Sequence, residues 1–266
     1  MVNPVHSALR RLVDEERLGA LATVVSGPDT GAGAVFDHEK GPVAGGLPED
    51  VAEDVVADAR SLMESEQSLT LGYGEREIFI ETVAPAPRLV IFGAVHVAQP
   101  LVKMAKELGF QVTVSDARPA FTTAERFPEA DEILVGWPEE VFEKLELDHR
   151  TYVVLLSHDV RFEDPVLPVV LRSPARYVGA MGSRRTHKRR LAKLQEAGFA
   201  EEQLGRVHGP VGLDIGAEQP AEVAVSILAE IIQVRYGSGT GEPLRGKEGR
   251  IHQPSSQPPP RGRGSS

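Results

Sequence analysis

The segment GSRRTH, residues 182–187, combines a glycine, a serine and two arginines at the point where a helix is predicted to begin. Backbone N–H groups at the start of a helix favour a bound anion. Arg184 and Arg185 would add charge-assisted hydrogen bonds of the kind that bind phosphate. The alternative is that Ser183 only caps the helix and the basic residues are solvated. Because positive side chains at this helix end oppose the helix dipole, the segment favours an anion site that includes Gly182 and Ser183.

A second candidate is VIFGAVHVAQ, residues 90–99, in which an apolar strand turns into a helix. A dinucleotide-binding loop needs the pattern G-x-G-x-x-G, and its three glycine positions are here Gly93, Val95 and Ala98. Gly93 suits the tight turn, but the branched side chain of Val95 would stand where a pyrophosphate normally sits. His96 is either part of a pocket wall or a partly buried histidine bonded to backbone. The segment therefore predicts a strand, loop and helix that bind a dinucleotide poorly.

Polar side chains also follow other predicted strands. Asp116 ends the strand after this loop, where an acidic residue often bonds a ribose hydroxyl. It would equally cap the turn that follows, and both interpretations stay open. Ser157, His158 and Asp159 end a later strand. Since ligands of open α/β sheets bind beyond the carboxyl ends of the strands, these residues are candidates for the same site.

The segment HGPVGLDIGAEQPAE, residues 208–222, adds Gly212 and Asp214 to the candidates. Its glycines would let backbone approach a ligand, or would only form turns. The helix predicted after it, residues 219–235, is apolar on most sides and is expected to be buried core.

The motifs of several enzyme classes are absent from the sequence. The chain has no cysteine, which excludes disulfides, thiolate metal sites and a cysteine nucleophile. Its histidines lack the spacing of H-E-x-x-H or a comparable metal motif. No G-x-S-x-G segment is present, so a serine hydrolase has little support.

The hydrophobic pattern predicts an α/β protein with two domains and a tail. Residues 1–84 are expected to form a small N-terminal α/β domain, in which GPVAGGLPED is a turn before a helix. Residues 85–236 repeat strand and helix, which predicts a Rossmann-like, doubly wound parallel sheet. Its strands are expected at 89–93, 111–116, 132–136, 152–157, 176–181 and 205–209. Its helices are expected at 97–108, 138–145, 163–171, 184–197 and 219–235. Residues 237–266 are rich in glycine, serine and proline and are predicted to be a flexible tail.

The composition and charge of the chain argue against further classes of function. The chain has 266 residues and a formal net charge of −10, which argues against general binding of nucleic acid. Its N-terminus lacks the continuous apolar region of a secretory signal, and no segment approaches the roughly 18 apolar residues of a membrane span. We therefore expect a cytoplasmic protein with no membrane partner.

Taken together, these residues resemble the XdhC/CoxI family, accessory proteins that mature molybdenum hydroxylases such as xanthine and carbon monoxide dehydrogenases. The resemblance covers most of residues 9–236. It is carried by LGALATVV, PRLVIFGAVHVAQPLVKMAKELGFQVTVSDARPAFTTAERFPEADEI, VVLLSHD, RYVGAMGSRRTHKRRLAKLQEAGF and HGPVGLDIGAEQPAEVAVSILAEIIQVR. The pair VGAMGSRRTH and GPVGLDIGA at this spacing is its most specific part.

The resemblance implies a chaperone of molybdenum cofactor, not a turnover catalyst. Such a protein binds the cofactor, protects it during sulfuration by a cysteine desulfurase and delivers it to the target hydroxylase. The expected partners are therefore this hydroxylase, the desulfurase and a second copy of the chain. The sequence departs from the family pattern in two ways: Leu47 stands where many relatives carry a cysteine, and Val95 and Ala98 replace glycines. Both departures leave room for an altered ligand or for a paralogue that binds none.

Two other functions compete with this one. The Rossmann pattern with Asp116 and His158 also fits an NAD(P)-dependent oxidoreductase, although Val95 opposes close approach of a pyrophosphate. A ligand-free protein that recruits a desulfurase or dehydrogenase is the third possibility. The expected cofactor is molybdopterin, with or without an attached nucleotide, and NAD(P) is the second candidate.

Overall fold

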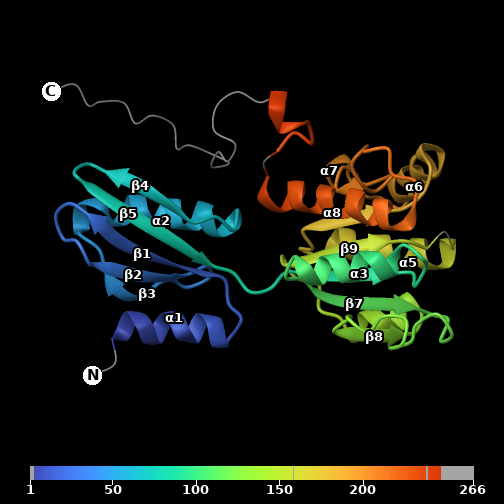
Figure 1. Ribbon diagram of the computed structural model, residues 1–266, viewed down its shortest axis with the longest axis horizontal. Helices are drawn as coiled ribbons and strands as arrows, with labels where there is room; N and C mark the ends of the chain where they lie inside the picture. The colour runs from blue at the N-terminus through green and yellow to red at the C-terminus, as the bar shows by residue number, and fades with distance from the viewer. Residues whose placement is uncertain (1–2, 158, 238, 247–266) are drawn as a thin grey trace. The chain divides into compact units, whose positions relative to one another are not determined.

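The computed structural model of the protein describes residues 3–157, 159–237 and 239–246 (Figure 1). His158 and most of the predicted tail lie outside the described residues. The chain divides after Pro85 into two compact units, which are described one at a time. None of the described helices is long and apolar enough to cross a membrane.

The first unit is an antiparallel sheet with one helix on each face. Its strands lie in the order β3-β2-β1-β5-β4. Its elements are α1 (Pro4–Asp14), β1 (Gly19–Ser26), β2 (Gly33–Asp37), β3 (Gly41–Gly46), α2 (Glu49–Glu64), β4 (Leu69–Tyr73) and β5 (Arg76–Val83). Side chains alternate along the strands, so Ala20 and Ala22 of β1 pack under α2, while Val35 of β2 packs under α1. Figure 1 shows the two helices on opposite sides of the sheet.

The segment predicted as a turn before α2 is partly a strand. Residues 41–46 form β3, which pairs with β2 at the edge of the sheet. An edge strand tolerates Pro42 and glycines because one side of its backbone needs no partner strand. The helix after it starts as predicted, with Pro48 at the N-cap and Glu49 and Asp50 in the first turn. The turn prediction was therefore wrong for the first part of the segment only.

The second unit is a parallel six-stranded sheet, as predicted. Its strands lie in the order β11-β10-β9-β6-β7-β8, so the strand order reverses between β6 and β9. Its strands are β6 (Arg88–Phe92), β7 (Gln111–Asp116), β8 (Glu132–Val135), β9 (Thr151–Leu155), β10 (Tyr177–Ala180) and β11 (Val207–His208). Its helices are α3 (Ala98–Glu107), α4 (Pro138–Phe142), α5 (Val160–Arg172), α6 (Arg184–Glu196), α7 (Glu201–Leu204) and α8 (Pro220–Tyr236). This is the strand order of Rossmann folds, and the predicted α/β fold class is confirmed.

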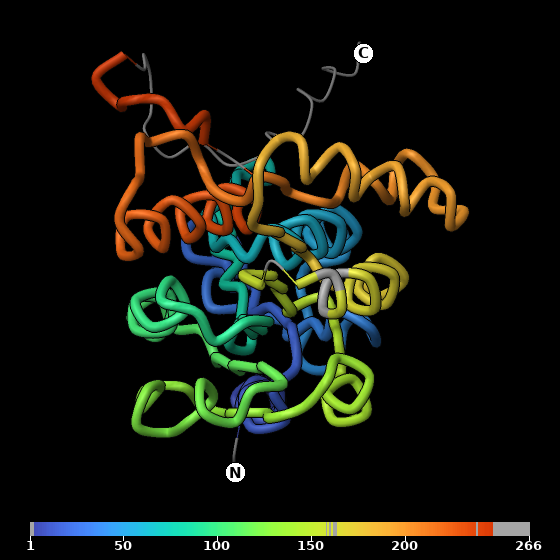
Figure 2. Tube along the Cα trace, turned by 90° about the vertical axis from the view of Figure 1, so that its right-hand side faces the viewer, coloured from blue at the N-terminus to red at the C-terminus, as the bar shows by residue number. Residues whose placement is uncertain are grey.

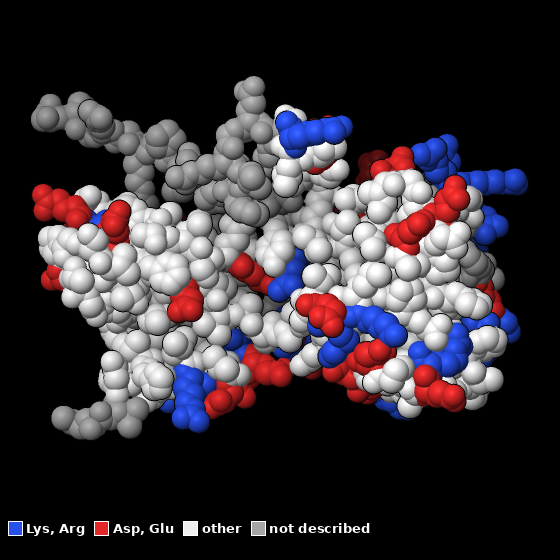
Figure 3. All heavy atoms as spheres, in the orientation of Figure 1, with Lys and Arg blue, Asp and Glu red and all other residues white. Residues whose placement is uncertain are grey.

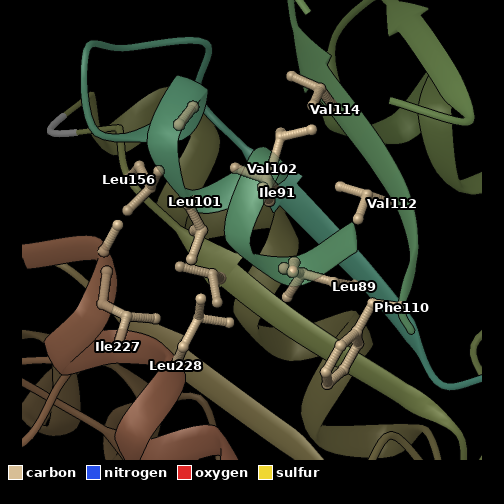
Figure 4. Packing of buried hydrophobic residues seen from close by; sticks show 14 of the residues in the cluster. Leu89, Ile91, Leu101, Val102, Phe110, Val112, Val114, Leu156, Ile227 and Leu228 are labelled. Atoms are coloured by element: carbon tan, nitrogen blue, oxygen red, sulfur yellow. The ribbon is translucent and has the colours of Figure 1, made fainter. Parts of the chain in front are cut away.

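Two hydrophobic clusters cover the two faces of this sheet. On one face, Leu89, Ile91 and Val114 pack against α3 and α8, as Figure 4 shows around Leu101 and Ile227. On the other face, strand residues pack against α4, α5 and α6; they are Val90, Phe92, Val153, Leu155 and Val178. Because the strands are buried on both faces, they are almost continuously apolar, which is why the sequence predicted them well.

Helix α7 was not predicted, and two other helices of the second unit differ from prediction by more than one residue at one end. Helix α5 begins at Val160, three residues earlier than predicted, because the Asp159 carboxylate accepts a hydrogen bond from the Arg161 backbone N–H and caps the helix. Helix α4 ends at Phe142, earlier than the predicted residue 145. Neither change moves the carboxyl ends of the strands.

The glycine after β6 is required by a close approach of two backbone segments. Gly93 has a φ of 113°, and a Cβ at this position would lie 2.7 Å from the backbone N of Ser157. Gly109 has a φ of 81°, but nothing lies within 4 Å of a Cβ there. The two glycines therefore share an unfavourable backbone angle, and only Gly93 also faces a clash.

We predict that Gly93→Ala destabilises the second unit more than Gly109→Ala does. The backbone angle costs about 1–3 kcal/mol at either site, and the clash adds to it at Gly93. The single tryptophan, Trp137, lies in the second unit, so its fluorescence during urea unfolding reports on this unit. Equal destabilisation by the two substitutions would mean that the approach of Gly93 to Ser157 is not tight.

Candidate functional site

The predicted site residues lie at the carboxyl ends of the parallel strands. In Figure 1 the arrow of β7 points to the right, and Figure 2 is turned so that this side of the molecule faces the viewer. Apart from His158, the structure places them as follows: Gly93 and His96 after β6, Asp116 at the end of β7, Asp159 before α5, Gly182 and Ser183 between β10 and α6, Arg184 and Arg185 in the first turn of α6, and Gly212 and Asp214 after β11. Local contacts divide them into two groups.

The first group is built on the carboxylate of Asp116, which is fully buried. One oxygen, Oδ2, accepts hydrogen bonds from the Ala94 backbone N–H at 2.9 Å and from Arg118 Nη2 at 2.7 Å. The other, Oδ1, accepts from the backbone N and the Nε of Arg118. The loop after β6 is thereby tied to the end of β7. Both oxygens are occupied by protein donors, which supports the turn-capping interpretation of Asp116 and not a ribose contact.

Burial and hydrogen bonding act on Asp116 in opposite directions. Burial alone would raise the pKa of this carboxyl, but the bonds from Arg118 and from the Ala94 N–H outweigh it and hold the pKa below its ordinary value. The ionised carboxylate therefore stabilises the fold at neutral pH. Since the folded pKa is depressed, this contribution is lost only as the pH falls through that pKa.

The loop after β9 joins the same group. The Ser157 Oγ accepts a hydrogen bond from the Asp159 backbone N–H at 3.1 Å. Asp159 in turn forms an ion pair with Arg161 at 2.6 Å, and its hydrogen bonds with Arg161 lower the pKa of its carboxyl. Arg118 lies near enough to attract the same carboxylate. The ends of β6, β7 and β9 are therefore connected by charged and polar contacts.

Two residues of the altered glycine loop differ in burial and in their contacts. Val95 is partly buried and packs against the hydrophobic cluster under α3, so part of its side chain faces the core. His96 is exposed, and no polar contact of its side chain occurs among the residues that the structure describes. His96 is thus not a histidine satisfied by backbone, and it remains open to solvent at the sheet edge.

The second group surrounds the start of α6. The Ser183 hydroxyl accepts a hydrogen bond from the Thr186 backbone N–H at 3.1 Å, so Ser183 is the N-cap. The first N–H groups of a helix have no partner within the helix. Arg184 and Arg185 are exposed, and within the described chain no carboxylate lies at ion-pair distance from either. Helix capping and an exposed basic pair therefore occur together at this helix start.

Beneath this turn lies an arginine that sequence reasoning missed. Arg190 is only 4% exposed, and its Nη2 donates to the carbonyl oxygen of Met181 at 3.0 Å. His187 lies one turn earlier and leaves no room for a Cβ at Gly209, so α6 contacts the loop after β11. Burial and the charge of Arg190 lower the pKa of His187, which favours its neutral form. Because α6 has six basic residues, composition alone does not single out the buried one.

The loop after β11 is held by Glu230 of α8, a second residue that sequence reasoning missed. Its Oε2 accepts hydrogen bonds from the Tyr177 hydroxyl at 2.6 Å and from the Gly212 backbone N–H at 2.8 Å. Its Oε1 lies 3.0 Å from His208 Nδ1. Burial would raise the pKa of Glu230, but the bonds with His208 and Tyr177 lower it overall. An acidic residue well inside an apolar helix was the signal that could have found it.

The same contacts restrict the rest of this loop. Burial, and then the Glu230 charge, raise the pKa of Tyr177 well above its ordinary value, so its hydroxyl remains a donor. Gly212 has a φ of 104°, and a Cβ there would clash with the Ser226 hydroxyl. Asp214 is exposed and makes no hydrogen bond within the described residues. The loop is thus fixed at Gly212 but open at Asp214.

The polar groups exposed at the start of α6 are hydrogen-bond donors and not metal ligands. In the described part of the chain, no cluster of three or more histidines and acidic residues could hold a metal ion. The donors gathered at the start of α6 are N–H and guanidinium groups, which bind phosphate oxygens.

Comparison with known proteins identifies the family. Residues 89–231 match the family model of the XdhC Rossmann domain, which is more than half of the chain. The chain belongs to the XdhC family. The two most specific segments of the resemblance, before and in α6 and in the loop after β11, both lie inside this match.

Three curated relatives are similar to this chain. A protein of Bacillus subtilis, named as a probable xanthine dehydrogenase subunit, is 35% identical over 59% of this chain and 46% of its own length. The molybdenum cofactor insertion chaperone PaoD of Escherichia coli is 33% identical over 57% of this chain and 41% of its own length. The uncharacterized protein YqeB of Escherichia coli is 34% identical over 68% of this chain and 33% of its own length. The chain thus spans less than half the length of each of these relatives.

One solved structure shows the same fold. It is described as a xanthine dehydrogenase from Bacillus halodurans, and the likeness covers 85% of this chain and 92% of the other, with a TM-score of 0.51. Its sequence is 22% identical to this chain, so the likeness concerns the fold alone.

We predict that Asp116→Asn lowers the stability of the second unit by about 1–3 kcal/mol at neutral pH, because an amide cannot accept all the hydrogen bonds that the carboxylate accepts. The difference from the unaltered protein should shrink as the pH falls through the depressed pKa of Asp116. Urea unfolding followed by Trp137 fluorescence at several pH values measures this. Asp214→Asn is the matched control and should change nothing; a pH-independent difference for Asp116→Asn would contradict the account.

We predict that Glu230→Gln loosens the loop after β11 without unfolding the second unit. Hydrogen exchange of residues 207–214 should become about tenfold faster or more, since the carboxylate that accepts from Tyr177 and Gly212 loses its charge. Exposed Glu196→Gln serves as control and should leave exchange of this loop unchanged. Unaltered exchange in the Glu230 variant would show that other contacts fix the loop.

Proposed function

We propose that this chain is a maturation factor that binds molybdenum cofactor and supports its sulfuration and its insertion into a molybdenum hydroxylase of the xanthine or carbon monoxide dehydrogenase type. Membership of the XdhC family supports the proposal, as does similarity to a relative named as a molybdenum cofactor insertion chaperone. In this role the chain acts as a chaperone. Its partners are the target hydroxylase, a cysteine desulfurase and a second copy of the chain.

The observation that carries the proposal is the exposed basic pair at the start of α6. Molybdopterin carries a phosphate, and its nucleotide form carries more than one. Arg184 and Arg185 have no carboxylate partner in the described chain, and the helix start adds unpaired N–H groups beside them. This arrangement leaves two positive charges available for an anion at the carboxyl edge of the sheet.

The residues present fit the phosphate end of the cofactor. Gly182 and Ser183 lie directly before α6, where a phosphate would meet backbone N–H groups, and the loop from Gly212 to Asp214 follows the neighbouring strand β11. The chain has no cysteine, so the cofactor's own sulfur atoms would remain the sulfur ligands of molybdenum. The protein then supplies binding, orientation and shelter from water, and the cofactor supplies the redox chemistry of the target enzyme.

The geometry supports NAD(P) binding less well. A dinucleotide of the usual kind places its ribose on the acidic residue after the second strand. Here that residue is Asp116, and both of its oxygens already accept hydrogen bonds from Ala94 and Arg118. NAD(H) and NADP(H) are therefore the comparison ligands in the test.

We predict that the protein binds molybdopterin and that Arg184→Ala with Arg185→Ala weakens this binding about 10- to 100-fold, because charge-assisted bonds to the phosphate are lost. Anaerobic titration under reducing conditions measures the affinity. Lys103→Ala with Lys144→Ala removes the same charge elsewhere on the second unit and should leave the affinity unchanged.

Two results would count against the proposal in different ways. An unchanged affinity of the arginine variant would remove the site assignment while leaving cofactor binding in place. Failure of the unaltered protein to bind any pterin, with saturable binding of NAD(H) or NADP(H), would favour the oxidoreductase instead.

A further inference from the structure

Helix α6 carries a concentration of positive charge in an acidic chain. Six of its thirteen residues are Lys or Arg and one is Glu, whereas the whole chain has a net charge of −10. Figure 3 shows blue side chains gathered at the upper right, the region that α6 occupies in Figure 1. Lys188 and Arg189, like the two arginines before them, have no ion-pair partner among the described residues. Six charges exceed what one phosphate at the helix start requires.

A groove runs along the same helix, between α5 and α6. It encloses a cavity of about 230 Å³. Leu167 and Pro168 of α5 and Leu194 of α6 give it apolar walls, while Arg189 and Lys193 supply positive charge. Lys193 also forms an ion pair with Asp164 at 3.2 Å. Because both side chains are more than half exposed, this ion pair contributes little stability and breaks easily. The groove therefore combines an apolar interior with a basic rim.

The groove begins at the first turn of α6 and extends well beyond it. Arg189 and Lys193 are four residues apart and share one face of α6, one and two turns beyond Arg185. Thr186 and Ala197 line the same groove at its two ends. The groove thus extends along the shaft of the helix, where an elongated partner has room that a single phosphate does not use.

We propose that this groove docks an acidic segment of a partner protein, with one apolar side chain in the cavity and flanking carboxylates on Arg189 and Lys193. The positive rim of the groove is complementary to an acidic partner. The apolar cavity fits an apolar side chain that lies between the carboxylates of this partner. A nucleic acid fits less well, because no aromatic side chain lines the described groove to stack on a base. The inference concerns a protein partner and requires no step of cofactor binding.

The test uses the full chain and two short fluorescein-labelled peptides. Both peptides consist of glutamates, with a central leucine in one and a central serine in the other, and fluorescence anisotropy measures their binding. We expect the leucine peptide to bind more tightly and salt to weaken both. Arg189→Glu with Lys193→Glu should weaken binding about tenfold or more. Lys103→Glu with Lys144→Glu makes the same charge change elsewhere and should have little effect.

A second variant tests the cavity separately from its charge. Ala197→Trp fills the end of the groove without altering any charge, so it should abolish the preference for leucine over serine while retaining weak, salt-dependent binding. Molybdopterin binding, measured on the same proteins, should persist in the Ala197 variant. Loss of the leucine preference with cofactor binding intact thus separates this proposal from the previous one.

Four results would overturn the proposal. The first is equal peptide binding by the charge-reversed and unaltered proteins. The second is an equal affinity of the unaltered protein for the leucine and serine peptides. The third is tighter, Arg189- and Lys193-dependent binding of duplex DNA or of phosphatidylserine vesicles, which would make the surface one for nucleic acid or membrane. The fourth is self-association, seen by sedimentation, that is lost on charge reversal, because the occupant would then be a second copy of the chain.

Discussion

The buried carboxylate of Asp116 fixes the geometry on which the site depends. It sits at the end of β7 and receives the N–H of Ala94 from the loop after β6. At the same point Gly93 approaches the backbone of Ser157, so the loops after three strands are held against one another. A buried charge is costly unless it is paired and hydrogen-bonded, and Arg118 with the backbone donors supplies both conditions. The position where many Rossmann proteins bind a nucleotide is here occupied by contacts within the protein.

We therefore propose that a ligand binds at the other half of the sheet edge. Around the ends of β10 and β11, backbone contacts and Glu230 hold the loops in place, while the arginines at the start of α6 are exposed to solvent. Support and recognition are therefore carried by different residues. Glu230 and Arg190 keep the loops in position, and Arg184 and Arg185 are available to bind.

Much of the fold could be predicted from the sequence, and so could the exposure of the residues at the start of α6. Strands buried on both faces, such as β6 and β9, are apolar after their first residue. The edge strand β3 was missed because its glycines and Pro42 have the composition of a turn, and only pairing with β2 makes it a strand. Ser183 could be placed because capping is a local effect. The partners of Glu230 lie more than fifteen residues away in the chain, so their meeting depends on the tertiary fold.

We propose that the ligand binds at the start of α6 and not at the altered glycine loop. Hydrogen exchange measured by mass spectrometry, with and without molybdopterin under anaerobic conditions, distinguishes these two positions. We expect slower exchange in residues 181–187 and 209–214 when molybdopterin is bound, with little change in residues 93–98. Protection confined to residues 93–98 would instead place the ligand at the altered glycine loop.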